Sequence, residues 1–96
     1  MLLNAYSLHD QKALNYSPPF FCNAHGQAVR MVMDLVGDPN TMPGRHPADF
    51  VLYCVGQWDD VAGILLPAEH REHITDALAL VPTKRTDYFT IPTTAK

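Results

Sequence analysis

The spacing of apolar and polar positions predicts two kinds of regular structure along the first third of the chain. A short, aromatic-containing run at residues 2–8 predicts a strand that ends in a polar turn. Residues 26–36 carry Gln27, Arg30 and Asp34 on one side and apolar residues, among them Ala28, Met31, Val32 and Leu35, facing inward. This pattern predicts an amphipathic helix, and the glycine that follows it is typical of a helix end.

Proline and glycine indicate where regular structure is interrupted. Residues 16–22 favour an extended segment, and Pro18-Pro19 limit it to an edge strand or to a loop that leads into one. Residues 38–49 contain three prolines and a glycine and show no periodicity, so we expect a loop there.

The most hydrophobic part of the chain predicts the central strand. Residues 50–58 are apolar on both faces, so this strand needs cover on both sides, and a second subunit could supply one of them. Residues 59–63 have the composition of a turn, and residues 64–66 would form the partner strand of a hairpin.

A second helix is expected from Pro67 to the proline at position 82. Its apolar stripe would consist of Ile74, Ala77, Leu78 and Val81. Residues 83–96 would give either one further strand or a partly mobile tail. The predicted fold is therefore a single α+β domain over residues 1–96, with a small antiparallel sheet of three to five strands and two helices packed on one face.

Composition narrows the function classes. The 96 residues suffice for one domain, and a net charge of −3 excludes a uniformly basic nucleic-acid coat. The longest apolar run, residues 50–55, is too short to cross a membrane, and we see no signal peptide. Cys22 and Cys54 lie in apolar surroundings, which favours buried reduced thiols in a cytosolic protein over a disulfide or a catalytic thiol.

Residues that could carry catalysis or bind a metal have simpler structural interpretations. His70 and His73, three apart on the expected second helix, could share a metal ion, but a solvated helix face is the favoured interpretation. Paired carboxylates at Asp59-Asp60 suit a hairpin turn, and His46 with Asp49 suits loop structure. The chain has no glycine-rich phosphate loop and no nucleophile elbow. We therefore expect no enzymatic activity, no metal and no cofactor.

The distribution of charge is more informative. Residues 1–83 hold four basic and nine acidic groups, whereas residues 84–96 hold three basic groups and one acidic group. Lys84 and Arg85 next to Tyr88 could contact phosphates and stack on bases of single-stranded DNA. An ordinary charged terminus is the alternative.

Five short motifs in a fixed order carry a family resemblance. They are Asp10-x-Lys12 with Tyr16-x-x-Pro19-Phe20-Phe21, Gly26-x-Ala28-x-Arg30-x-x-x-Asp34, Asp38-Pro39-Asn40, His46-Pro47-x-Asp49-Phe50-x-Leu52-Tyr53, and Val55-Gly56-x-Trp58-Asp59-Asp60-x-x-Gly63. Together they resemble the small nonstructural protein of gokushoviruses, single-stranded DNA bacteriophages of the microvirus family. The resemblance covers about residues 3–66, and Trp58 stands where that family usually has Phe.

The resemblance implies a protein that is made in the cytoplasm of the bacterial host, stays outside the virion, and supports replication or packaging of the single-stranded genome. Its expected partner is single-stranded DNA or the viral or host replication proteins, with no membrane involved. Arg30 is a predicted phosphate or partner contact. Its pairing with Asp34 on the helix surface would add only a few tenths of a kcal/mol, so stability alone is a weak reason for an arginine there. Lys12 is predicted to make a contact of the same kind. The alternative is a host-directed protein–protein interaction module without DNA affinity. A homodimer is expected because the core is small.

Overall fold

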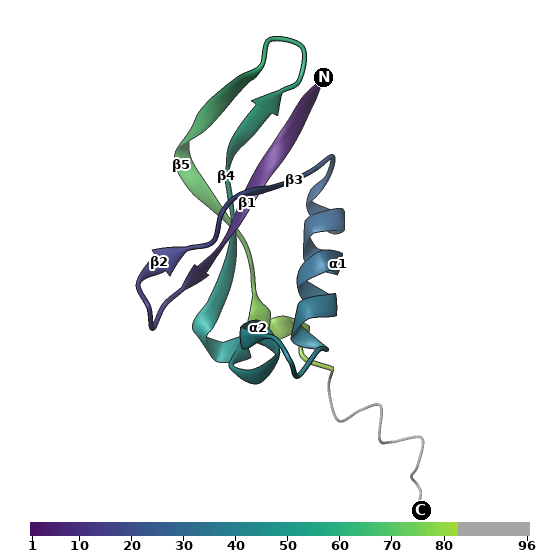
Figure 1. Cartoon of the computed structure of the whole chain (residues 1–96), viewed down its shortest axis with the longest axis vertical. Helices are drawn as coiled ribbons and strands as arrows, with labels where there is room; N and C mark the ends of the chain where they lie inside the picture. The colour runs from purple at the N-terminus through teal and green to yellow at the C-terminus, as the bar shows by residue number, and fades with distance from the viewer. Residues whose placement is uncertain (83–96) are drawn as a thin grey trace, which may run out of the picture.

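Residues 1–82 are described by the computed structural model, and they form a five-stranded antiparallel sheet with its helices on one face (Figure 1). The elements in chain order are β1 (Leu2–Asp10), β2 (Asn15–Tyr16), β3 (Phe20–Cys22), α1 (His25–Val36), α2 (Met42–Arg45), η1 (Pro47–Asp49), β4 (Phe50–Asp59), β5 (Ile64–Asp76) and η2 (Ala77–Leu80). The strand order is β2-β1-β4-β5, and β3 also pairs with β1. The expected α+β class is confirmed.

The predicted central strand is β4, which pairs with β1 on one side and with β5 on the other. Between Ala5 and Tyr6 of β1 the register shifts, so that Tyr6 pairs with Cys54 and Ala5 with Gly56. The extra residue on β4 is Val55, and such a bulge bends and twists the sheet locally.

The core lies between the sheet and α1. Tyr6 from β1, Leu52 from β4 and Val32 from α1 are the largest fully buried side chains. Phe50 and the free thiols of Cys22 and Cys54 are also buried, which confirms the expectation of buried cysteines. One sheet face is therefore covered by α1, and we call the opposite face the outer face.

The predicted helix is confirmed as α1. The N–H of Gly37 donates to Met33 O (3.0 Å) at its end, and the polar side chains of Gln27, Arg30 and Asp34 are exposed. Met31 was expected to face inward but is 47% exposed. Only the narrow stripe of Ala28, Val32 and Val36 is buried. Met31 lies at the edge of this stripe, where its sulfur is 3.5 Å from that of Cys22 and the side chain lines an open hollow with Leu3 and Arg30.

The second helix, expected from Pro67, does not form. That part of the chain continues β5 to Asp76 and ends in the short 3-10 helix η2. The apolar stripe that suggested a helix is divided between Ile74 at the end of β5 and Leu78 in η2. Pairing with the long apolar strand β4 outweighs local helix propensity here.

The expected loop at residues 38–49 contains two short helices, α2 and η1. Thr41 caps α2, because its hydroxyl oxygen accepts the N–H of Gly44 (3.0 Å). The same hydroxyl donates to Leu35 O (2.7 Å), which joins α2 to the end of α1. Two predictions about the strands are also confirmed. The extended segment at residues 16–22 contains the edge strands β2 and β3, which Pro18 and Pro19 separate, and β4 and β5 form the expected hairpin.

Candidate nucleic-acid interface

The outer face of the sheet brings together aromatic rings from four strands. Directly paired residues of antiparallel strands lie on one face, and His9 of β1 pairs with Tyr16 of β2 while Tyr53 of β4 pairs with His73 of β5. The His9 and Tyr16 rings are stacked with centroids 4.3 Å apart. The Tyr53 ring lies 6.1 Å from Tyr16 and 6.0 Å from His73.

Arg71 completes this group from β5. Its guanidinium carbon lies 4.9 Å from the centre of the Tyr53 ring and 5.4 Å from that of Tyr16. Both distances are typical of cation–π contacts. We call the five residues His9, Tyr16, Tyr53, Arg71 and His73 the outer-face aromatic cluster.

An irregularity in β5 places Arg71 there. Gly56 pairs with Pro67 and Cys54 with Glu72, so residues 68–71 lie opposite the single residue Val55. The extra length makes β5 bow out from the ladder, as a bulge does. A regular strand would have no such excess of chain at this point.

The cluster combines rigid ring faces with one exposed positive charge. Tyr16 is 38% exposed, His9 and Tyr53 are half-buried, and Arg71 and His73 are exposed. The ring nitrogen Nε2 of His73 lies 2.9 Å from Oδ1 of Asp76, which fixes the orientation of that imidazole. Exposed rings beside an arginine can stack on nucleobases and contact phosphate, which is how sequence-tolerant single-strand binding works.

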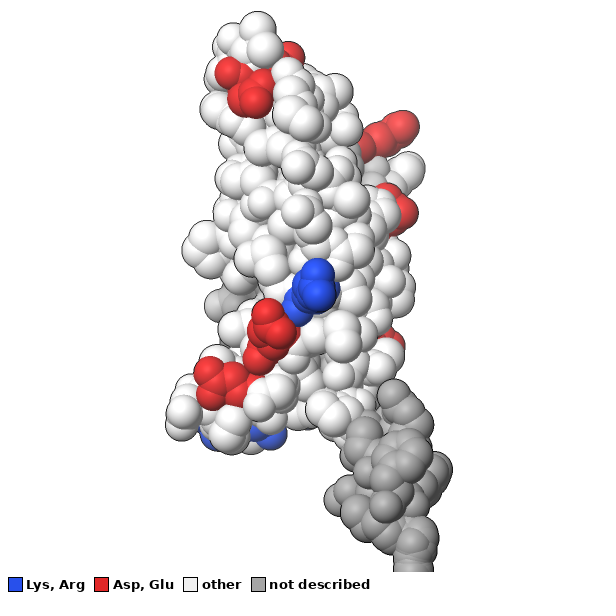
Figure 2. All heavy atoms as spheres, turned by 90° about the vertical axis from the view of Figure 1, so that its right-hand side faces the viewer, with Lys and Arg blue, Asp and Glu red and all other residues white. Residues whose placement is uncertain are grey.

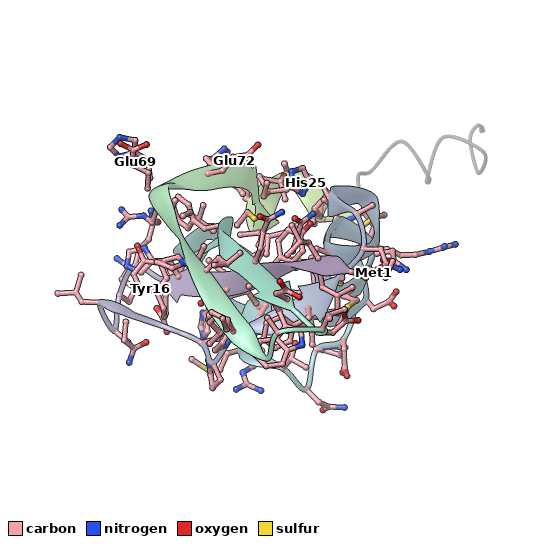
Figure 3. The ribbon with its side chains drawn as sticks, turned by 90° about the horizontal axis from the view of Figure 1, so that it is seen from above. Met1, Tyr16, His25, Glu69 and Glu72 are labelled. Atoms are coloured by element: carbon pink, nitrogen blue, oxygen red, sulfur yellow. The ribbon has the colours of Figure 1, made fainter. Side chains whose placement is uncertain are left out.

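A second polar cluster lies on the helix side, at the start of α1. The buried Tyr6 hydroxyl lies 2.6 Å from Nδ1 of His25 and accepts from the Asn4 amide (3.1 Å). Nε2 of His25 lies 3.6 Å from a Glu72 oxygen. Burial raises the pKa of Tyr6 above its usual value. Figure 3 shows His25 and Glu72 near each other and Tyr16 well apart from them. This cluster fastens α1 to the sheet.

Comparison with known proteins identifies the family. The model of the family described as Phage ORF5 protein matches residues 3–80, which is most of the chain. The chain belongs to the Phage ORF5 protein family. No curated protein and no solved structure matches it.

Five residues of this phage ORF5 protein are predicted nucleic-acid contacts, and two of them, Lys12 and Arg30, lie within the described residues. Lys12 lies in the turn between β1 and β2, directly after the strand that holds His9. Arg30 is exposed on α1, on the other side of the sheet from the aromatic cluster, and residues 1–82 contain no Arg30–Asp34 ion pair. Figure 2, which faces the α1 side, shows acidic groups in more places than basic ones. The remaining three, Lys84, Arg85 and Tyr88, lie outside the described residues.

The histidine pair expected on a helix lies on a strand instead. His70 lines a hollow with His25 and Glu72 on the helix side of β5, whereas His73 belongs to the outer-face cluster. A shared metal ion is therefore not supported by their positions. Among residues 1–82 no group of three metal-ligating side chains is present, and no helix is long and apolar enough to cross a membrane.

The aspartates singled out in the sequence make local contacts in turns or with the N-terminal amine. Oδ1 of Asp59 accepts the N–H groups of Val61 and Ala62 (3.0 and 3.1 Å), and these bonds lower its pKa. Asp60 forms an ion pair with the N-terminal amine (2.8 Å). The N–H of Asp49 donates to His46 O (3.0 Å). These contacts agree with the structural interpretation of each motif.

Sequence reasoning missed most of the outer-face cluster. The sequence predicts Tyr53 only as part of a central strand that is apolar on both faces, and it predicts Arg71 and His73 within the helix that does not form. The available signal was the alternation of His9 with buried Leu8 and of Tyr53 with buried Leu52, which places both rings on the face away from the core.

Proposed function

We propose that this phage ORF5 protein binds single-stranded DNA on the outer face of its sheet, and that it acts by binding rather than by catalysis. The observation that carries the proposal is the outer-face aromatic cluster, to which four strands contribute side chains. A ring that only filled the core would lie on the α1 side, as Tyr6 does.

Base stacking would supply most of the affinity. Stacking on an exposed aromatic ring contributes about 1–3 kcal/mol per base, and it is insensitive to sequence because every base has a flat face. Tyr16 and Tyr53 each offer part of a ring on this face. The stacked pair of His9 and Tyr16 is held in place before DNA arrives, so little conformational entropy is lost on binding.

Phosphate contacts would be few. Arg71 lies in the cluster, and Lys12 lies in the turn that follows β1. Two neutralised phosphates on a single strand give a log–log salt slope of about −1.4, so a tenfold rise in salt would weaken binding about 25-fold. Lys84 and Arg85 would steepen this slope to about −2.8 if they also contact phosphate.

The biological setting that we propose follows the resemblance to the gokushovirus nonstructural protein. The protein would act in the cytoplasm of the bacterial host, outside the virion, in replication or packaging of a single-stranded genome. Binding to the exposed strand, or to the replication complex that carries it, suits a small protein that acts by binding, as proposed above.

A host-directed protein–protein interaction module is the second candidate. The observation that favours it is the excess of acidic over basic groups in residues 1–83, nine against four. A surface of this sign repels nucleic acid at long range and would suit a basic protein partner.

Fluorescence-anisotropy titration of a single-stranded oligonucleotide at two salt concentrations, with a duplex of equal length as comparison, tests the proposal. The wild-type protein should bind the single strand more tightly. Tyr16→Ala and Arg71→Ala should each weaken binding, the first by roughly tenfold to a hundredfold. Arg45→Ala is the matched control, because it removes one exposed arginine from α2.

Two outcomes would overturn DNA binding at this face. The first is no binding at low salt, which would favour the interaction module. The second is equal weakening by Arg71→Ala and Arg45→Ala, which would mean that only total charge matters. Arg30→Ala and the double variant Lys84→Ala/Arg85→Ala test the other predicted contacts separately.

A further inference from the structure

An open hollow of about 430 Å³ lies at the edge of the sheet, between β3 and α1. Its sides come from Phe21 and Asn23, at and directly after β3, and from Gln27, Arg30 and Met31 on α1. Figure 1 shows the chain passing from β3 into the start of α1 at this edge. The volume is within the range of about 300–1,000 Å³ that is typical of small-molecule sites. We call this hollow the edge hollow.

The spacing along α1 explains why three of its side chains meet in the edge hollow. Gln27 lies three residues before Arg30 and four before Met31, so their side chains share one face of the helix. Oε1 of Gln27 accepts the backbone N–H of Asn23 (2.9 Å), which joins the helix to the end of β3. This bond uses the acceptor of the Gln27 amide, so that its NH₂ group remains a donor for a ligand.

The edge hollow carries a positive charge in a chain that is acidic overall. Arg30 is the one charged side chain in its lining, and Arg30 forms no ion pair within residues 1–82. By contrast, the hollow that His25 and His70 line also contains the carboxylate of Glu72. A guanidinium group without a carboxylate partner favours an anionic ligand, and its planar fork suits two oxygens of a phosphate.

The apolar part of the lining indicates what the anion is attached to. The Phe21 ring is 41% exposed, and the Trp58 ring supports it with the two centroids 6.2 Å apart. Met31 is 47% exposed, and its sulfur lies 3.5 Å from that of the buried Cys22. An aromatic ring and a thioether that are packed on one side offer apolar contact surface to a planar group. A bare phosphate ion would leave this surface uncovered.

We propose that the edge hollow binds one nucleotide, with its base against Phe21 and Met31 and its phosphate against Arg30. The amide groups of Asn23 and Gln27 are then available to the hydrogen-bonding edge of the base, as such amides are to adenine in nucleic-acid complexes. The proposal gives a ligand to Arg30, which the outer-face aromatic cluster leaves unused. It does not rest on DNA binding at the outer face, because the two sites share no residue.

Titration of the full chain with deoxyadenosine monophosphate, followed by heteronuclear NMR spectroscopy, tests this proposal. The backbone N–H signals of Asn23, Gln27 and Arg30 should shift and saturate, with a dissociation constant of about 1 mM or below. Deoxyadenosine lacks the phosphate and inorganic phosphate lacks the base, so each should bind at least about tenfold more weakly.

Arg30→Ala should weaken binding of the nucleotide at least about tenfold and leave binding of deoxyadenosine unchanged. Because Arg30 is exposed and alanine is a strong helix former, this variant should keep its fold. Arg45→Ala is the matched control, since it removes an exposed arginine from α2, outside the edge hollow. Phe21→Leu keeps an apolar side chain but removes the ring, and it should weaken binding of both the nucleotide and the nucleoside.

Three outcomes would overturn the proposal: no shift at about 10 mM nucleotide, shifts confined to the outer-face aromatic cluster, or equal binding of the nucleotide by the wild type and Arg30→Ala. A single-stranded oligonucleotide distinguishes the source of the nucleotide. If Arg30→Ala weakens its binding too, the edge hollow takes a nucleotide of a strand, and if not, it takes a free nucleotide. Binding of the nucleotide in the edge hollow without any binding of the oligonucleotide would contradict only the outer-face proposal.

Discussion

Replacing Gly56 by alanine tests the geometry that places Arg71 beside the aromatic rings. Gly56 pairs with Pro67 at the start of the β5 irregularity, where the two strands approach closely. A Cβ at this position would lie 2.4 Å from the carbonyl oxygen of Leu66 and 3.3 Å from the Cα of Pro67. Both neighbours are backbone atoms, so the strand itself must move to admit one methyl group.

The expected cost follows from that overlap. Real Cβ atoms essentially never approach within 3.0 Å of another heavy atom, so β5 must shift by more than half an ångström at Leu66. Overpacking of this kind costs about 1–3 kcal/mol. In a domain of this size, each kcal/mol lowers the melting temperature by about 4–8 °C. Gly56→Ala should therefore melt roughly 5–20 °C below the wild type.

Thermal and urea unfolding followed by circular dichroism measure this difference, with Gly26→Ala as the matched control. Gly26 lies in the first turn of α1, where an added Cβ meets no atom within 4 Å. Alanine there should be neutral or stabilising by up to about 1 kcal/mol. If Gly56→Ala melts at or above the wild-type temperature, the close approach of β4 and β5 is wrong.

Three further predictions concern single side chains. Tyr6→Phe removes the hydroxyl that is bonded to His25 and Asn4 and should lower the free energy of unfolding by about 1 kcal/mol in urea; an unchanged midpoint would contradict these bonds. Two backbone N–H bonds hold the pKa of Asp59 below its usual 3.8, so its stabilisation is present above that pH and is lost as the pH falls through the lowered folded-state pKa. Asp59→Ala should accordingly be less stable than the wild type at about pH 6, and a difference that persists undiminished at about pH 2 would refute the assignment. Burial raises the pKa of the Cys22 thiol, so a thiol reagent at about pH 8 should modify it more slowly in the native protein than in urea, and equal rates would contradict its burial.

The elements that could be predicted from the sequence are those whose signals are local. The helix α1 carries its polar stripe, its apolar stripe and its terminal glycine within a dozen residues, and all of them agree. The strand β4 is apolar on both faces, which already implies a central place in the sheet. The hairpin that follows it has turn residues between two apolar runs, and these too are adjacent in the chain.

The element that could not be predicted is β5, because its structure is decided by a distant partner. Its polar middle, residues 68–73, suits an exposed helix face as well as an exposed edge strand. Pairing with β4 decides between them, and no local pattern reports that pairing. The same holds for the candidate site, because Tyr16, Tyr53 and Arg71 meet only through sheet register. Lys12 was the predicted contact that the fold places next to this face.

The most direct test of the central claim is photo-crosslinking of the full chain to a bromodeoxyuridine-containing single-stranded oligonucleotide, with the crosslinked residues located by mass spectrometry. DNA binding on the outer face predicts crosslinks at Tyr16 and Tyr53, with none at the buried ring of Phe50. Crosslinks confined to α1, or confined to residues 84–88, would contradict that claim and place the contact elsewhere on the protein.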